Sequence, residues 1–469
     1  MSQRIVINPV TRISGFMEID VQVEANRVVD AQTKGSFFRG FEQMMVGRNP
    51  FDAIYLTQRI CGICSTAHSV ASSVALEDAL GVQVTEQGRY LRDILHGCEF
   101  LQNHLRHFYQ FTLPDYVKLP AVSSFLKSPD HGDFRLPAAV NEELAGHYFE
   151  ALQVSRLAHQ MLAILGGKAP HNHGVFVGGV TRAPTVDQIV SMRSILSEIS
   201  AFVREKAVPD VYTIARYYED YFRMGRGPGN LLSYGLFDRY PQLGTLYVDP
   251  LVYTAGRTQP FRPELITEEI DFAWYQGQRS YTPLETMTEP DLQKKGAYSW
   301  VKAPRYDGLP CEVGPLARLW LSGEYRAGLS AMDRTIARTL EKRKVTEILT
   351  TLLDQLEPGV PLQQAWELPD QATGIGLVDT TRGALGHWLK LENRLLSFYQ
   401  IITPSAWDFS TRDTKQHGTA EQALLGTEIR NPEQPIELGR ILRSFDPCMS
   451  CATHLYQPGK DPVTIQIFG

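Results

Sequence analysis

Four of the six cysteines form two Cys-x-x-Cys pairs at opposite ends of the 469-residue chain. The first pair, Cys61 and Cys64, lies in RICGICSTAHS, and the second, Cys448 and Cys451, lies in RSFDPCMSCATH. A Cys-x-x-Cys loop turns back on itself and brings two sulfurs within reach of one metal, so two such loops supply four thiolates. If the pairs share one site, both ends of the chain must meet in a single folded unit.

The spacing of the pairs leaves four kinds of site open: structural zinc, an iron or iron–sulfur centre, disulfides, and a catalytic metal centre. Zinc modules are usually local, with roughly 15–20 residues between pairs. A site that closes only after a large core has formed suits the burial of a reactive metal better. His68 and His454 each lie within four residues of a pair, as outer donors that tune metal thiolates often do.

Composition excludes several classes of protein. Hydrophobic residues make up 43% and charged residues 21% of the chain, which is typical of a folded soluble protein. A formal net charge of −6 argues against a nucleic-acid binder. The chain has no stretch of 18 apolar residues, and its start, MSQRIVINPVTRISG, has no signal segment. Membrane association or export would therefore come through a partner.

The hydrophobic periodicity predicts a mainly α fold with a smaller β part. Residues 1–35 alternate as strands, with a turn at 24–26. A helix is expected over 65–81, with Ser65 or Thr66 as its cap and Gly81 at its end. The segment of about 207–310 reads as irregular strands and loops, and Val463, Ile465 and Ile467 suggest a strand in the tail. Longer helices are expected at 86–112, 139–165, 186–206 and 328–356, the last with Arg, Lys and Glu on a solvent-exposed face.

No repeat or linker divides the sequence, so we expect one large domain over 1–469. It would consist of the strand region 1–35, a helical core over 36–454 and a C-terminal extension over 455–469. Cys98 and Cys311, which lie outside the two pairs, are expected to be core residues.

RICGIC-x3-H near the start and DPCxxCxxH near the end resemble the large subunit of nickel–iron hydrogenases. The resemblance extends in order along most of the chain. It implies that family's fold, a core of long helices with antiparallel strands at the N-terminus. Further matching stretches are FFRGFEQMMVGRNPFDA, HFYQFTLPDYV, VGGVT, KAPRYDGLPCEVGPLAR, TRGALGHW and TPSAWDFSTRD.

The resemblance implies a catalytic subunit that cleaves H2 reversibly into protons and electrons. Nickel would be held by four thiolates and bridged to an iron that carries one carbon monoxide and two cyanide ligands. Cys61 and Cys448 would be terminal nickel ligands, and Cys64 and Cys451 would bridge nickel to iron. Cleavage would be heterolytic, with Cys448 accepting the proton.

Several outer groups carry over from the same resemblance. Arg382 would lie over the open metal position, and Asp446 would pair with it. Ser405, which follows Pro404, would donate a hydrogen bond to a cyanide ligand. His68 would hydrogen-bond the sulfur of Cys64.

A second metal site, for magnesium or iron, is implied near the C-terminus. Its ligands would be Glu42, His454 and the carbonyl oxygen of Ile401. This expectation rests on the resemblance alone.

The sequence departs from the family pattern at two positions near the site. Ser14 stands where the family usually has a glutamate that accepts the proton, and a hydroxyl cannot hold a proton as a carboxylate does. Asn103 stands where an aspartate usually pairs with the arginine, so Arg382 should depend more on Asp446. With Ser14 in place of the glutamate, either water bridges past Ser14, or another group leads the proton path, or turnover is slow.

The implied partners are an obligate iron–sulfur small subunit, a maturation chaperone and, where the tail is cleaved, an endopeptidase that removes Leu455–Gly469. Nucleic acid is not expected, and membrane contact would come only through partner subunits. The location would be the periplasm or the outer face of the cytoplasmic membrane, reached by the small subunit's export signal, with the cytoplasm as the alternative.

Three functions other than the enzyme are also compatible with parts of the sequence. A hydrogen-sensing regulatory subunit with low turnover keeps the fold, and Ser14 and Asn103 give it mild support. The related respiratory-complex subunit lacks the cysteine set, which is complete here. A structural zinc protein does not account for the flanking motifs.

Overall fold

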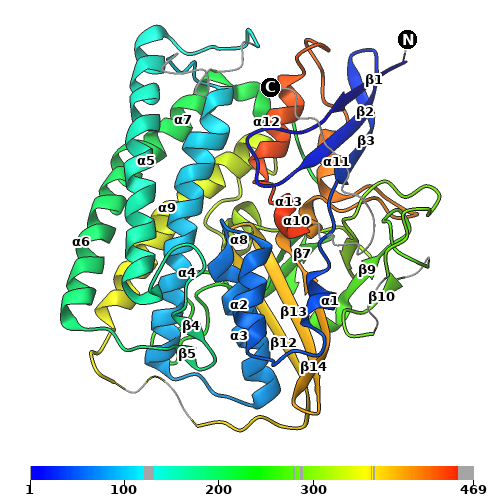
Figure 1. Cartoon of the computed structure of the whole chain (residues 1–469). Helices are drawn as coiled ribbons and strands as arrows, with labels where there is room; N and C mark the ends of the chain where they lie inside the picture. The colour runs from blue at the N-terminus through cyan, green and yellow to red at the C-terminus, as the bar shows by residue number, and fades with distance from the viewer. Residues whose placement is uncertain are drawn as a thin grey trace.

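The computed structural model describes residues 2–120, 131–277, 280–285, 289–360, 362 and 365–452. His454 and the strand expected at 463–467 lie outside the described residues. Figure 1 shows long helices along one side of the molecule and small antiparallel sheets along the other.

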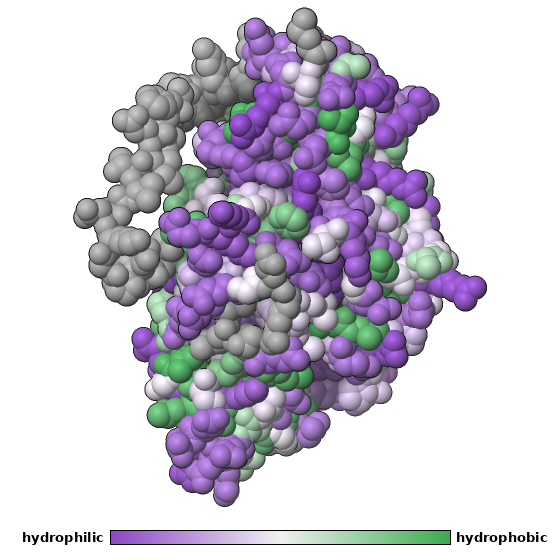
Figure 2. All heavy atoms as spheres, turned by 90° about the vertical axis from the view of Figure 1, so that its right-hand side faces the viewer, coloured by the Kyte–Doolittle hydropathy of each residue, from purple (hydrophilic) through white to green (hydrophobic). Residues whose placement is uncertain are grey.

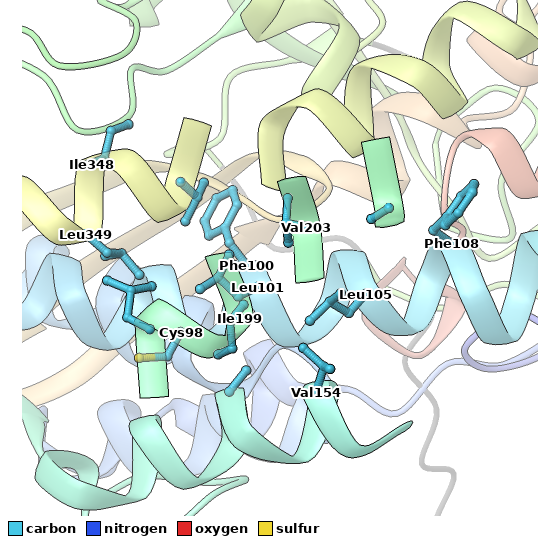
Figure 3. Close-up of a cluster of buried hydrophobic side chains, with 14 of the residues drawn as sticks. Cys98, Phe100, Leu101, Leu105, Phe108, Val154, Ile199, Val203, Ile348 and Leu349 are labelled. Atoms are coloured by element: carbon cyan, nitrogen blue, oxygen red, sulfur yellow. The ribbon is translucent and has the colours of Figure 1, made fainter. Parts of the chain in front are cut away.

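The helical side is built from α4 (Glu86–Arg106), α5 (Ala138–Gly166), α6 (Val186–Phe202) and α9 (Ala331–Asp354). The four long helices expected from periodicity are therefore confirmed. Their apolar faces form one core, in which Cys98 and Leu101 of α4 lie beside Leu349 of α9 (Figure 3). A Cβ on Gly97 would lie 2.5 Å from the Leu349 side chain, so glycine permits this close helix contact.

Two details of the helical prediction were wrong. The helix expected to stop at 206 continues through a π-helical turn at Val203–Ala207 into α7 (Val208–Tyr217), so the irregular segment begins later. The expected polar face of α9 is only partly exposed: Arg343 and Glu347 face solvent, but Arg334, Arg338 and Glu341 are each at most 3% exposed. Their charges are neutralised inside the protein, since Arg334 pairs with Glu312 at 2.7 Å and Glu341 with Arg318 at 2.7 Å.

The strand region at the N-terminus is confirmed as the antiparallel sheet β1 (Ser2–Ile7), β2 (Met17–Glu24) and β3 (Arg27–Gly35). A second antiparallel sheet was missed. It consists of β12 (Gln371–Thr380), β13 (Gly383–Glu392) and β14 (Leu395–Ile402), and α3 (Ser65–Leu80) packs on it.

The remaining elements of the described chain are short.

Figure 2 shows the face on the right of Figure 1, where hydrophilic side chains predominate and hydrophobic ones lie in small groups. Among the described residues, none of the helices has the length and apolar character of a membrane span. The short elements are α1 (Phe41–Met45), α2 (Asp52–Leu56), β4 (Val175–Phe176), β5 (Gly179–Val180), β6 (Leu231–Ser233), β7 (Leu251–Thr254), β8 (Arg257–Pro260), β9 (Ile266–Glu269), β10 (Ser280–Tyr281), β11 (Ala303–Tyr306), α8 (Pro315–Ser322), α10 (Pro404–Asp408), α11 (Thr419–Leu424), α12 (Ile436–Ser444) and α13 (Met449–Ala452).

A buried carboxylate joins the two ends of the chain to the helical core. Asp115, just after α4, pairs with Arg12 from the N-terminal segment and with Arg443 of α12, the latter at 2.6 Å. Burial alone would raise the pKa of Asp115, but the Arg12 and Arg443 guanidinium groups outweigh it and lower that pKa to about 2.

We expect Asp115→Asn to lower the free energy of unfolding by about 3–5 kcal/mol, because it leaves two guanidinium groups without their buried partner. Chemical denaturation of the purified protein measures this change, with Asp220→Asn, in a more exposed ion pair, as the control. Because the pKa of Asp115 is lower in the folded than in the unfolded protein, its ion pairs stabilise the fold fully above the unfolded pKa, near 4, and this stabilisation is lost as the pH falls towards 2. The free energies of unfolding of wild type and Asp115→Asn should therefore converge between pH 4 and pH 2. A constant difference between them would contradict the ion-pair account.

Candidate metal site

The four cysteines of the two pairs meet in one buried cluster. Cys61 and Cys64 lie in the loop before α3, Cys448 precedes α13, and Cys451 lies within α13. The Sγ–Sγ distances are 3.2 Å for Cys61–Cys448, 3.1 Å for Cys64–Cys451, 3.2 Å for Cys448–Cys451 and 3.9 Å for Cys64–Cys448. These distances exceed a disulfide bond, and all four cysteines are free. The geometry therefore fits four ligands converging on metal.

Backbone hydrogen bonds hold the C-terminal pair against the start of the chain. The amide of Met449 donates to the carbonyl of Ser14 at 2.7 Å, and the amide of Ser14 donates to the carbonyl of Pro447 at 3.2 Å. Gly15 has φ +82°, and a Cβ there would lie 2.4 Å from the amide nitrogen of Ser450. Only glycine allows this close approach. The backbone of Ser14 thus lies beside that of Cys448.

A second contact links the two cysteine loops directly. The guanidinium of Arg39 donates to the backbone carbonyls of both Ile60 and Ser450. Each of these residues is adjacent to a cysteine of the cluster, so one side chain fixes both loops relative to each other. Sequence reasoning missed this arginine, because nothing local marks a contact between such distant segments.

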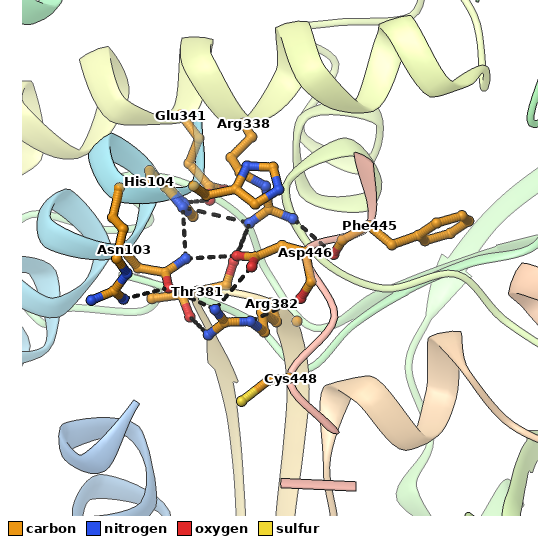
Figure 4. A network of polar contacts seen from close by, with 12 residues as sticks. Asn103, His104, Arg338, Glu341, Thr381, Arg382, Phe445, Asp446 and Cys448 are labelled. Carbon is orange, nitrogen blue, oxygen red and sulfur yellow. Dashed lines mark hydrogen bonds and ion pairs between the residues drawn. The ribbon is translucent and has the colours of Figure 1, made fainter. Parts of the chain in front are cut away.

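Arg382 lies in the turn between β12 and β13, above the cysteines (Figure 4). Its Nη2 donates to Asp446 Oδ1 at 2.9 Å and to Asn103 Oδ1 at 2.8 Å, and its Nε donates to the Asp446 carbonyl at 2.9 Å. A cavity of about 10 Å³, room for roughly one water-sized molecule, lies between Arg382 and the sulfurs of Cys64, Cys448 and Cys451.

Asp446 is the centre of this polar network. It accepts from Asn103 Nδ2 at 2.7 Å and lies 3.3 Å from Arg338, a residue that sequence reasoning missed. Burial alone would raise the pKa of Asp446, but Arg382 and the other donors around it outweigh burial and hold that pKa well below its usual value. Asn103 therefore bridges Arg382 and Asp446, a role beyond the loss of charge expected from the sequence.

The surroundings of Cys448 differ from those of the other three cysteines in their effect on the thiol pKa. Hydrogen bonds from Cys451, Cys61 and Cys64 lower the pKa of Cys448, and the positive charge of Arg382 acts in the same direction. Cys448 is thus the thiol that this environment most favours as a thiolate, which is the form that binds metal.

Ser405 and His68 both line the cavity. Ser405, which follows Pro404 in the first turn of α10, accepts a hydrogen bond from the Cys448 amide at 3.0 Å through Oγ. The Nδ1 of His68 lies 3.2 Å from Nε2 of His387, whose Nδ1 is 2.8 Å from the hydroxyl of Tyr399. His387 and Tyr399 were not predicted to belong to the site.

Two of the three ligands expected for a second metal, Glu42 and Ile401, lie on α1 and β14, which contact each other. Burial raises the pKa of Glu42 of α1, against the positive charge of Lys302. Ile401 lies in β14 opposite His387, and His454 is beyond the described residues. Lys302 and Glu268, 3.7 Å apart, add a buried ion pair that the sequence did not reveal.

Glu99 of α4 is a further residue that sequence reasoning missed. Cys64, not Ser65 or Thr66, is the N-cap of α3, and no side chain of that cap accepts a hydrogen bond. Instead the Glu99 carboxylate accepts from the amides of Thr66 at 2.7 Å and Ala67 at 3.1 Å. Those amides would otherwise be unsatisfied at a helix start. Cys98 and Cys311 are fully buried and lie outside the cluster, as predicted.

A mainly α fold that encloses four convergent thiolates under an arginine defines a metal-dependent catalytic subunit. The chain belongs to the nickel-dependent hydrogenase family, whose family model matches residues 39–128 and 122–454. Within that family it corresponds to the large subunit, and it is an oxidoreductase that acts on H2.

The chain is similar to the periplasmic [NiFeSe] hydrogenase large subunit of Desulfomicrobium baculatum, with 36% identity over 96% of this chain and 95% of that protein. It is 29% identical to the hydrogenase-2 large chain of Escherichia coli, over the full length of both. Among solved structures, the [NiFeSe] hydrogenases of D. baculatum and of D. vulgaris Hildenborough each superpose with a TM-score of 0.93. At 36% and 37% identity, each covers 97% of this chain and 100% of the solved one.

Proposed function

We propose that this chain cleaves H2 heterolytically at a nickel–iron centre held by Cys61, Cys64, Cys448 and Cys451. The observation that carries the proposal is the convergence of four buried, free thiols from the two ends of the chain. Thiolates are soft ligands that suit nickel and iron, so the donor set fits the group. Cys61 and Cys448 would be terminal ligands, and Cys64 and Cys451 would bridge the metals.

The centre, when bound, would supply the polarisation that splits H2, and the residues around it would do the rest. Cys448 would hold the released proton, because it lines the cavity beneath Arg382 where H2 would be split. Arg382 would fix the space above the metals, since Asp446 and Asn103 hold its guanidinium in place. H2 carries no charge and offers little binding energy, so catalysis must rest on a preorganised site.

The ligands of the iron would be one carbon monoxide and two cyanides. Ser405 supports this part, because its Oγ accepts from the Cys448 amide and leaves the hydroxyl hydrogen free to donate to a cyanide in the cavity. Pro404 fixes the turn that presents the hydroxyl. Magnesium, or iron, would bind to Glu42, His454 and the Ile401 carbonyl.

Electrons would leave through an iron–sulfur small subunit. Four of the six cysteines are committed to the cluster, and the other two are fully buried in the core, so this chain has no cysteine set for iron–sulfur clusters of its own. A chaperone would assist loading, and an endopeptidase would remove Leu455–Gly469. The periplasm, or the outer face of the membrane, is the proposed location, by likeness to the periplasmic relative; the cytoplasm is the alternative.

The test is infrared spectroscopy of the purified complex with its small subunit, combined with nickel and iron analysis. We expect carbon monoxide and cyanide stretching bands, about one nickel and one iron in the cluster, and dye-linked H2 oxidation. Zinc in the cluster without those bands would overturn the proposal.

A hydrogen-sensing subunit is the second candidate, which Ser14 and Asn103 favour because both positions lack a carboxylate. The same spectra combined with very low dye-linked turnover, and a signalling kinase as the bound partner, would identify a sensor.

A further inference from the structure

A row of polar side chains runs along one face of α4, away from the four cysteines. Asn103, Glu99, His96 and Arg92 follow at intervals of three or four residues, so they lie on the same side of the helix. All four are at most 7% exposed. Polar groups buried in series need a reason, because each costs free energy to remove from water.

Glu99 is the member of the row that contacts the segment after Cys64. It reaches the first turn of α3, where it accepts from the amides of Thr66 and Ala67, directly after the ligand Cys64. Its partners there are uncharged, unlike those of the other carboxylate near the cluster, Asp446, which is paired with Arg382.

His96, one turn further along α4, leads outward. It lines a cavity of about 390 Å³, and its buried Nε2 has no hydrogen-bond partner in the structure. Val70 of α3, one turn after Thr66, lines the same cavity. The rim includes Asp93 and the exposed Arg239, so the cavity is polar and reaches solvent.

We propose that Glu99 and His96 carry protons between the four-cysteine site and this cavity, with Glu99 replacing the carboxylate that the chain lacks at Ser14. The proposal rests on the function proposed above. It assigns Glu99 as the relay residue and His96 as the group that passes the proton to cavity water.

The transfer balances without any oxidant or reductant. Oxidation of one H2 gives two protons and two electrons, and the electrons leave through the iron–sulfur partner. A proton held by Cys448 passes to the Glu99 carboxylate and forms the acid. The protonated Glu99 passes its proton on to one ring nitrogen of His96, while the other ring nitrogen releases a proton to water in the cavity. H2 evolution would run the same path in reverse.

The surrounding charges support these roles. Burial, against the hydrogen bonds of the Thr66 and Ala67 amides, raises the pKa of Glu99 to about 7, so both of its forms are accessible near neutral pH. Burial, with the nearby charges of Arg318 and Arg92, lowers the pKa of His96 to about 3. His96 therefore stays neutral, and a neutral imidazole can accept at one nitrogen while it donates from the other.

The test uses the complete metal-loaded complex. Glu99→Gln keeps a carbonyl oxygen for the α3 amides but cannot carry a proton. We expect its dye-linked turnover to fall at least about tenfold, which is less than the roughly 100-fold lower end for general acid–base groups because water can partly bypass it. Glu99→Asp should recover most of the loss. Glu421→Gln, the same change in a buried carboxylate hydrogen-bonded outside the cluster, should stay near wild type.

Two readouts separate proton transfer from a structural role. With unchanged metal content and infrared bands, Glu99→Gln should show a larger solvent deuterium isotope effect and slower exchange of D2 with water protons. Loaded Glu99→Gln within twofold of wild type would overturn the path. If Glu99→Gln does not load metal, His96→Gln is the test of the path. A fall of at least about tenfold in the dye-linked turnover of His96→Gln supports the path, and unchanged turnover overturns it. A wild-type complex that shows no H2 cleavage would instead overturn the proposed function.

Discussion

The Cys448→Ser variant should lose H2 oxidation almost completely, to less than about a thousandth of wild-type turnover. Loss of an outer partner of a metal ligand already costs about 10–100-fold, and this change removes the ligand itself. A serine hydroxyl is a hard donor that is not ionised near neutral pH, so it replaces neither the bond to nickel nor the proton acceptor. The Sγ atom of Cys448 lies 3.2 Å from the Sγ atoms of both Cys61 and Cys451, so the substitution removes the sulfur that adjoins two other ligands of the cluster.

Dye-linked H2 oxidation and nickel analysis of the purified complex measure this effect. Cys311→Ser is the matched control, because Cys311 is equally buried but lies outside the cluster, and it should keep its nickel and most of its activity. A Cys448→Ser protein that keeps nickel, the infrared bands and more than a tenth of the activity would remove Cys448 from the proposed role.

The second large effect is expected for Arg382→Lys, which should lower turnover by about 100-fold or more, as loss of a preorganised donor does in other active sites. The guanidinium contacts three acceptors at 2.8–2.9 Å, two on Asp446 and one on Asn103. A lysine ammonium keeps the charge but cannot reproduce this planar fork. The variant therefore keeps the positive charge but loses the fixed position of that charge above the metals.

Metal content and infrared bands should be retained in Arg382→Lys, because its side chain is not a metal ligand in the proposed site. Arg394→Lys, in an exposed ion pair with Asp370 at 2.8 Å, tests the same substitution away from the site and should have no effect. Full activity in Arg382→Lys would show that charge alone suffices above the metals.

The features that the sequence predicted well are those that short patterns encode. The two Cys-x-x-Cys loops identified the cluster, and hydrophobic periodicity located α4, α5, α6 and α9. The polar face assigned to α9 was only partly right, because Arg334 and Glu341 find buried partners on other elements, which periodicity does not reveal. The sheet β12–β14 was missed because its central strand is buried almost continuously and so shows no alternation. One face of the sheet is covered by α3, which packs so closely that a Cβ on Gly374 would lie 2.0 Å from the Ala75 carbonyl.

Within the site, the residues that sequence reasoning missed make contacts between distant segments. Glu99 takes the place of a local cap for α3, Arg338 of α9 reaches Asp446, and Arg39 ties Ile60 to Ser450. No spacing rule relates such positions, because the tertiary fold alone brings them together. The change at Asn103 was noticed, but its bridging amide required the structure.

The hydrogen bonds between Ser14 and the residues flanking Cys448 set an order of events during protein synthesis. The ribosome releases Cys61 and Cys64 long before it has made Cys448, so the first two thiols wait with half of their binding site missing. During that interval they are open to oxidation and to capture of the wrong ion. A metal that is to bind all four thiols can therefore find its complete ligand set only after the C-terminal segment has been made.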